Sequence, residues 1–204
     1  MSLRIGYGFD SHAFKPGVPL MLGGLHIEHR EGLAGHSDGD VLLHALTDAL
    51  LGAVSAGDIG TFFPPSDSRW KGAASSLFLR TAMEEIHTAG YKVVNVDSVL
   101  IMAQPKIVPI ANELRESVAE LLGVPPGDVG IKAKTPEGLN LDGVAVAHVT
   151  VLLESLETED GKKVMAVAAD VDELNEVVES LVIGVRDTSA LGRKRPVFDT
   201  DDLT

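Results

Sequence analysis

The chain has 204 residues, a formal net charge of -13 and no cysteine. This length accommodates one domain of ordinary size and a further segment, and the lack of cysteine excludes disulfides and thiolate zinc sites. The acidic balance argues against nucleic acid as a partner, because affinity for its backbone comes from Lys and Arg. No apolar run is long enough to span a bilayer and the N-terminus does not resemble a secretion signal, so we expect a cytoplasmic protein without a membrane partner.

The N-terminal half of the chain predicts strands, turns and one clear helix. That helix is indicated by Val41, Leu42, Ala45, Leu46 and Ala49, which recur at the spacing of a helical face. The Pro- and Gly-rich stretch before it contains short apolar pieces, as a hairpin does. In chain order we expect a strand at residues 3–9 that ends at Asp10, a hairpin at 15–27, a turn at 35–39, a helix from near Ser37 or Asp38 through Gly52, and a loop at 57–67.

The following part predicts two more helices and three strands. Gly90 and Gly123 come after helical stretches and are typical helix stops. In chain order we expect a helix at residues 73–89, a strand at 93–102, a helix from Pro105 to about Leu122, and strands at 129–133 and 144–153. This order predicts an α/β fold of two layers, with a mixed four-stranded sheet, helices on one face and a small β-hairpin.

The composition changes after Leu153. A polar linker at residues 154–163 is followed by Asp170, a candidate N-cap, and by Gly184, a candidate helix stop. Between them, apolar residues recur at helical spacing: Val171, Leu174, Val177, Val178, Leu181 and Val182. We therefore predict one domain at residues 1–155 and a C-terminal extension at 156–204, with one amphipathic helix and a mobile tail.

Asp10, His12 and His44 are the candidates for a metal site. At positions i and i+2 of an extended segment, the side chains of Asp10 and His12 point to the same side. His44 lies on the predicted helix and adds a third ligand, and three nitrogen and oxygen ligands with an open fourth position are what catalytic zinc requires. Asp48, one helical turn later, could orient the His44 imidazole. The alternative is an N-cap aspartate and surface histidines.

Two further segments could bind phosphate. Residues 36–40 precede the helix and would present backbone N–H groups to an anion, although a plain N-cap explains them too. Residues 132–138 follow a strand and offer Lys, Thr and Glu side chains, which suit a phosphate–Mg²⁺ site; a strand-end turn of mixed charge is the alternative. Residues 57–60 and 63–67 could present amides and a carboxylate to sugar hydroxyls, and ordinary turn chemistry explains them equally well.

These segments are more specific together than any of them is alone. Residues 4–12 read RIGYGFDSH, residues 35–40 read GHSDGD, residues 43–52 read LHALTDALLG, and residues 57–60 and 63–64 read GDIG and FP. In order and in spacing they closely resemble the 2-C-methyl-D-erythritol 2,4-cyclodiphosphate synthase family. The resemblance extends from about Leu3 to Leu153.

The resemblance implies a homotrimer of α/β two-layer subunits, with active sites between neighbouring subunits. The implied enzyme, a phosphorus–oxygen lyase of the non-mevalonate isoprenoid pathway, converts 4-diphosphocytidyl-2-C-methyl-D-erythritol 2-phosphate to the 2,4-cyclodiphosphate and CMP. One Zn²⁺ per subunit would be bound by Asp10, His12 and His44. Mg²⁺ or Mn²⁺ would be held by the substrate diphosphate and Glu137.

The same resemblance implies roles for the other site residues. His36 and Thr135 would be catalytic, because they would stabilise the transition state. The residues expected to contact the substrate are Asp10, His12, Ser37, Asp58, Ile59, Gly60, Phe63, Asp67, Met102, Pro105, Lys106, Lys134 and Glu137.

The chain also departs from the family pattern. Pro65 stands where the family often has Asp, and Lys134 stands where many members have a small hydroxyl residue. Residues 141–144 lack an arginine that helps close a cavity on the trimer axis, which argues against a prenyl diphosphate there. Two other classes stay open: a zinc-dependent phosphohydrolase on the same scaffold, and a non-catalytic trimeric module with structural zinc.

Overall fold

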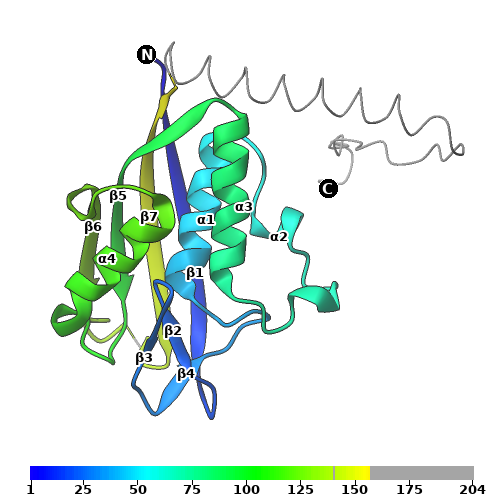
Figure 1. Ribbon diagram of the computed structural model, residues 1–204. Coiled ribbons are helices and arrows are strands. Elements are labelled where there is room, and N and C mark those ends of the chain that lie inside the picture. The colour runs from blue at the N-terminus through cyan, green and yellow to red at the C-terminus, as the bar shows by residue number, and fades with distance from the viewer. Residues whose placement is uncertain (140, 157–204) are drawn as a thin grey trace, which may run out of the picture. The chain divides into compact units, whose positions relative to one another are not determined.

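The structure is a computed structural model, and it describes residues 1–139 and 141–156. Strands and helices are mixed along these residues, as the sequence predicts (Figure 1). The strands are β1 (Leu3–Pro16), β2 (Leu20–Leu22), β3 (Leu25–Ile27), β4 (Glu31–Leu33), β5 (Tyr91–Ile101), β6 (Val129–Lys134) and β7 (Val144–Ser155). The α-helices are α1 (Val41–Ala53), α2 (Ile59–Phe62), α3 (Ser75–Thr88) and α4 (Ala111–Leu122), and the 3-10 helices are η1 (Ser68–Trp70), η2 (Val108–Ile110) and η3 (Pro126–Asp128).

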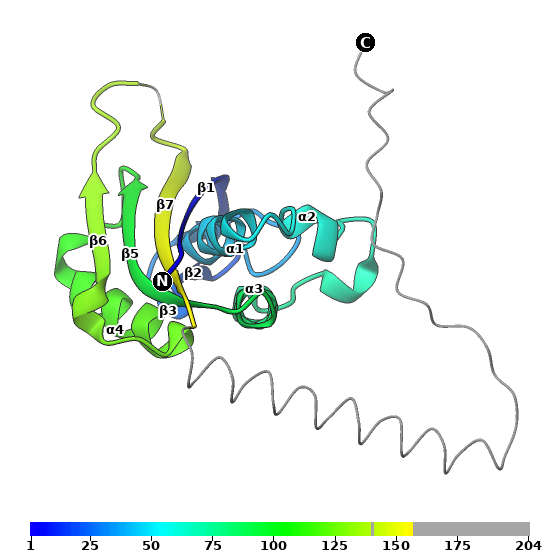
Figure 2. The same cartoon turned by 90° about the horizontal axis from the view of Figure 1, so that it is seen from above.

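The main sheet has five strands in the order β4-β1-β7-β5-β6, and β2 and β3 form the predicted hairpin. Only the β5–β6 pair is parallel among the pairs of the main sheet. The predicted count of four strands is wrong because β4, three residues long, pairs with the end of β1 and is too short to show an alternating pattern. The two-layer fold is confirmed: in both views α1, α3 and α4 lie on one side of the sheet (Figure 1, Figure 2).

Strand β1 contacts helix α1 through glycine. A Cβ atom added to Gly6 would lie 1.8 Å from the carbonyl oxygen of Ala49, and one added to Gly8 would lie 1.8 Å from that of Ala45. No side chain larger than hydrogen fits there, so the backbones of strand and helix come unusually close. This close approach places the start of α1, including His44, beside the continuation of β1.

Alternation along β1 leaves its other face open. Gly6 and Gly8 are buried against α1, whereas Ile5, Tyr7 and Phe9 are exposed by 73%, 60% and 50%. Successive side chains of a strand point to opposite faces. The sheet therefore has one face covered by helices and one open face, on which β1 presents apolar side chains.

Two predicted boundaries are wrong, and both concern residues of the candidate site. Strand β1 does not end at Asp10 but continues to Pro16, so both Asp10 and His12 lie within it. The helix expected from Pro105 begins only at Ala111, after η2. Pro105 and Pro109 lack the amide hydrogen that a continuing helix needs.

Smaller differences lie around α1. This helix begins at Val41, with Asp40 as its N-cap, and not near Ser37 or Asp38. The predicted loop at 57–67 contains the short helix α2, capped by the Asp58 carboxylate, which accepts a hydrogen bond from Thr61 N.

The C-terminal predictions concern another part of the chain. Most of the linker and the helix expected between Asp170 and Gly184 lie outside the described residues, so the division at residues 155 and 156 stays a prediction. Among residues 1–139 and 141–156, no helix is long and apolar enough to cross a bilayer.

Candidate functional site

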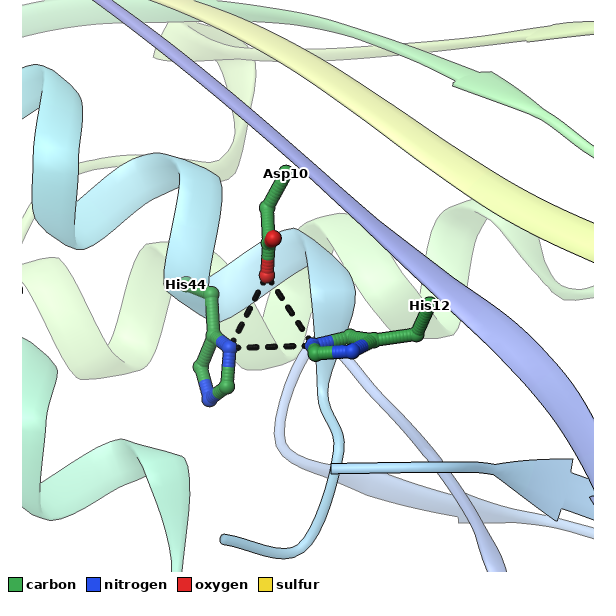
Figure 3. A group of neighbouring side chains, drawn as sticks. All are labelled: Asp10, His12 and His44. Atoms are coloured by element: carbon green, nitrogen blue, oxygen red, sulfur yellow. Dashed lines mark hydrogen bonds and ion pairs between the residues drawn. The ribbon is translucent and has the colours of Figure 1, made fainter. Parts of the chain in front are cut away.

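The side chains of Asp10, His12 and His44 converge where β1 passes the start of α1 (Figure 3). Asp10 Oδ2 lies 2.9 Å from His44 Nδ1 and 3.0 Å from His12 Nε2. The two imidazole nitrogens lie 3.1 Å apart. The predicted grouping of these three residues is therefore confirmed by the geometry.

The donor atoms fit a metal ion. Tetrahedral zinc with bonds of about 2.0–2.1 Å separates its ligand atoms by roughly 3.3 Å, close to the three separations here. Nitrogen and carboxylate oxygen are suitable donors, and a fourth position is left open by three protein ligands. Three lone-pair atoms at this spacing repel one another unless a proton or a cation lies between them. The group is therefore a candidate metal centre, in which Asp10, His12 and His44 would be the ligands.

The Asp10 carboxylate is held in its ionised form. Burial by itself raises the pKa of Asp10, but hydrogen bonds from His12 and His44 and their charges outweigh burial and lower that pKa below its usual range. A carboxylate that stays ionised is the form that binds a cation.

The partner of the second His44 nitrogen differs from the prediction. His44 Nε2 lies 2.8 Å from Ser37 Oγ, and the expected contact with Asp48 is wrong. Asp48 Oδ1 instead accepts a hydrogen bond of 2.8 Å from Ile59 N. Asp48 thus connects α1 to α2, and burial followed by the nearby charge of Asp58 raises its pKa.

An aromatic contact connects the segment after α1 to His44 through helix α3. Phe63 packs on Phe78 with ring centroids 4.3 Å apart, and Phe78 lies 5.9 Å from the His44 ring. His36 is exposed, and its Nε2 lies 3.4 Å from the carbonyl oxygen of Asp67. The predicted residues Ser37, Ile59 and Phe63 are thus brought to the neighbourhood of the metal ligands.

Two other predicted residues here already have partners. Asp58 Oδ1 accepts hydrogen bonds of 2.8 Å from both the amide and the hydroxyl of Thr61, next to Gly60 in α2. Asp67 binds the Arg69 guanidinium, and this ion pair lowers the pKa of Asp67. An ionised carboxylate has several acceptor positions, so these contacts orient both side chains while each can still accept a further hydrogen bond from a sugar hydroxyl.

The remaining predicted residues gather where β5 and β6 end. These strands are parallel, so their carboxyl ends meet, and Met102 N donates to Lys134 O at 3.2 Å. The Thr135 hydroxyl hydrogen-bonds the Glu137 carboxylate, and Lys106 Nζ donates to Ala103 O. Met102 as a whole is only 3% exposed, so the structure leaves little of this predicted residue accessible to a ligand.

The two groups lie far apart within one chain. Register places Asp10 level with Ala147, Leu100 and Ala133 across the sheet. Three strand spacings of about 4.8 Å separate Asp10 on β1 from Ala133 on β6, or roughly 14 Å in all. Lys134 belongs to the next row, so its side chain leaves the face opposite to that of Asp10. One subunit therefore does not bring the two groups together.

The sequence missed two polar residues beside the centre. Ser75 Oγ lies 3.3 Å from Ser37 Oγ, and the Asp38 carboxylate accepts hydrogen bonds from both the hydroxyl and the amide of Ser75. Ser75 is fully buried at the first position of α3. A serine at a helix start is a common local pattern, so only the contact across 38 residues reveals it.

Fold and site together define a two-layer α/β protein with a His/carboxylate metal centre between a strand and a helix. Comparison with known families is specific: the model of the YgbB family matches residues 3–154. The chain belongs to the YgbB family.

Named relatives are similar over nearly their whole length. The 2-C-methyl-D-erythritol 2,4-cyclodiphosphate synthase of Koribacter versatilis is 66% identical over 152 residues, which are 74% of this chain and 98% of the relative. That of Treponema denticola is 52% identical, over 69% of this chain and 88% of the relative. A solved structure of a 2C-methyl-D-erythritol-2,4-cyclodiphosphate synthase in a CDP-bound form has a TM-score of 0.71 at 44% identity, covering 74% of this chain and 100% of that chain.

Proposed function

We propose that this chain converts 4-diphosphocytidyl-2-C-methyl-D-erythritol 2-phosphate to 2-C-methyl-D-erythritol 2,4-cyclodiphosphate and CMP, as a phosphorus–oxygen lyase of the non-mevalonate isoprenoid pathway. The convergence of Asp10, His12 and His44 carries this proposal. It occurs in a chain that is 66% identical to a relative named for the cyclodiphosphate product.

The reaction needs alignment more than a strong base. An oxygen of the 2-phosphate forms a bond to the β-phosphorus, and the bond from that phosphorus to the cytidine monophosphate breaks, so CMP leaves with the electron pair. The attacking phosphate is already anionic. Phosphoryl transfer of this kind depends on positioning and on neutralising charge. A chain with a net charge of -13 must supply that neutralisation locally.

Zn²⁺ is the ion proposed for the centre. Two imidazole nitrogens and one carboxylate, without any thiolate, are a typical ligand set of catalytic zinc. Bound zinc would act as a Lewis acid that polarises and orients a phosphate. Asp10, His12 and His44 would hold it.

The group at the ends of β5 and β6 is proposed to bind the rest of the substrate. Glu137 and the phosphates themselves would hold Mg²⁺ or Mn²⁺, since hard oxygen ligands suit these ions. The Thr135 hydroxyl and the His36 imidazole would donate to phosphate oxygens in the transition state. Pro105 and Lys106 would line the cytidine side.

A homotrimer with sites between subunits is part of the proposal. The two groups lie roughly 14 Å apart across three strand spacings within one chain, so a neighbouring subunit would have to supply one of them. The open face of the sheet supports such an assembly, because Leu3, Ile5, Tyr7 and Phe9 expose apolar side chains on it. Exposed apolar surface of this kind marks interaction sites.

Product analysis tests the proposal. The purified chain, supplied with Zn²⁺, Mg²⁺ and the cytidyl substrate, should release CMP and the cyclic diphosphate in equal amounts, as followed by phosphorus NMR. A linear phosphate product would instead identify a hydrolase, in which water is the nucleophile. If there is no turnover although zinc is bound, the protein is a non-catalytic module.

A further inference from the structure

A chain of hydrogen bonds leads away from the metal centre on the outer side of His44. Figure 3 shows one ring nitrogen of His44 facing Asp10 and His12, and the other pointing away from them. That outer nitrogen, Nε2, lies 2.8 Å from Ser37 Oγ. Ser37 Oγ lies 3.3 Å from Ser75 Oγ, and the Ser75 hydroxyl binds Asp38 Oδ1.

Metal binding by His44 would fix which atom donates and which accepts in each of these hydrogen bonds. A ligand nitrogen must offer its lone pair to the metal, so the proton of His44 has to be on Nε2, and Ser37 Oγ must accept it. The Ser75 hydroxyl donates to the Asp38 carboxylate, which can only accept while it is ionised. Ser75 Oγ is thereby free to accept from Ser37. Every donor then points away from the metal and toward the Asp38 carboxylate.

Asp38, the last residue of this series of hydrogen bonds, is itself held by backbone contacts. The second carboxylate oxygen of Asp38 accepts a hydrogen bond of 3.0 Å from Ser75 N at the start of α3. Asp38 N donates to the carbonyl oxygen of Ala73 at 3.0 Å, and Asp38 Oδ1 also accepts from Asp40 N at 3.2 Å. Ser75 itself is fully buried. The hydrogen bonds from His44 through Ser37 and Ser75 to Asp38, called the relay below, therefore connect a candidate metal ligand of α1 to the N-terminus of α3.

We propose that Ser75 and Asp38 are positioning residues of the metal centre. Acting through Ser37, they fix the proton on His44 Nε2 and the orientation of its imidazole, and so keep Nδ1 ready to bind the metal. Outer partners of ligand histidines typically contribute 10-fold to 100-fold to metal affinity. This inference rests on the metal centre of the proposed function. It adds two residues that are not among the candidate metal ligands.

Measured zinc affinity tests the relay. Ser75→Ala removes the hydroxyl but keeps the backbone N–H that binds Asp38, so α3 should still begin at the same residue. We expect it to weaken Zn²⁺ binding about tenfold in competition with a chromophoric chelator. Ser76→Ala, at the next position of the same helix, is the matched control and should bind like the parent protein. Asp38→Asn keeps an acceptor oxygen without the charge and should weaken binding less.

A double variant separates positioning from mere packing. If Ser75 acts through Ser37, then Ser37→Ala and the Ser37→Ala/Ser75→Ala double variant should bind zinc equally weakly. Additive losses would overturn the relay, and so would a Ser75→Ala protein that binds zinc within twofold of the parent. Thermal melting of the metal-free proteins shows whether each variant is folded. A parent chain that binds no zinc would overturn the metal centre itself, and the relay with it.

Discussion

His44 uses both ring nitrogens, one toward Asp10 and His12 and one toward Ser37. His44→Ala removes a ligand from the centre, while Ala preserves the helix around it. We expect zinc binding to be lost and the fold to be kept, as measured by metal analysis together with circular dichroism. His87→Ala, on an exposed position of α3, should retain full metal content. Stoichiometric zinc in His44→Ala would contradict the assigned ligands.

The lowered pKa of Asp10 has a consequence for the metal-free protein. When the pKa of a carboxyl group is lower in the folded state than its unfolded value of about 3.9, the ionised form stabilises the fold above that value. This contribution is lost as the pH falls through the folded pKa, because both states are then protonated. The free energy of unfolding of the parent should therefore exceed that of Asp10→Asn at pH 7, and the difference should shrink below about pH 4. Urea unfolding at several pH values measures it; a difference that grows in acid would contradict the assignment.

The sequence predicts contacts between site residues correctly where those residues are close together along the chain. Asp10 and His12 share one face of β1 because strand side chains alternate, and this follows from their spacing alone. The pairing of Ser37 with Ser75 joins residues 38 positions apart, and no spacing rule encodes it. For the same reason the helical spacing wrongly predicts that Asp48 contacts His44. The Asp48 carboxylate instead accepts a hydrogen bond from Ile59 N on a different helix.

The contact between β1 and α1 sets the geometry of the metal centre. Gly8→Ala would place a Cβ 1.8 Å from the carbonyl oxygen of Ala45, so α1 would have to move away from the strand and carry His44 with it. We expect a loss of about 3 kcal/mol in unfolding free energy, together with weaker zinc binding. Gly52→Ala is the control on the same helix, since its Cβ would meet nothing within 4 Å. It should be neutral or stabilising by roughly 0.5–1 kcal/mol.

The start of α1 is decided by partners from outside the helix. The Asp40 carboxylate accepts hydrogen bonds from Leu43 N of the first turn and from Gly23 N and Gly24 N of the hairpin. The residues Ser37, Asp38 and Asp40 are all acceptable N-caps by type, so the sequence could not choose among them. Only Asp40 also satisfies the hairpin amides, and this tertiary contact fixes the boundary.

Asp40→Ala should be strongly destabilising for that reason. It removes a helix cap and leaves buried amides without acceptors, a loss of about 3 kcal/mol or more in unfolding free energy. Asp40→Asn keeps one acceptor oxygen and removes a buried charge whose burial raises the pKa of Asp40, so its loss should be smaller. Urea unfolding of both variants measures the difference, and equal stability of Asp40→Ala and the parent would show that the cap is dispensable.

At the largest scale, residues 1–139 and 141–156 form a two-layer fold that the order of strands and helices predicts, because such elements have few ways to bury one face of a sheet. The oligomeric assembly is harder to predict from the sequence than the fold of one subunit. The sequence predicts which residues belong to the site, and the strand order shows that two strands, β7 and β5, lie between β1 with Asp10 and β6 with Lys134. The apolar residues on the open face, such as Ile5 and Tyr7, are where a neighbouring subunit would pack.

Mixing two inactive variants tests that assembly directly. His44→Ala lacks a zinc ligand and Glu137→Ala lacks the proposed magnesium ligand, so each alone should be inactive. If each site takes one group from each of two neighbours in a ring of three, every mixed trimer contains one intact site. Random mixing in equal amounts makes three quarters of the trimers mixed, and about one quarter of the parent activity should return.

The same mixture distinguishes the alternative arrangement. If both groups of a site came from one chain, each subunit would carry one defect and co-expression of the two variants would restore nothing. A mixture of His44→Ala with His12→Ala is the control, because both changes damage the same group and no intact site can form in either arrangement. Activity that returns only with the Glu137→Ala partner would therefore place Glu137 and His44 on different subunits of one site, which is the arrangement that we propose.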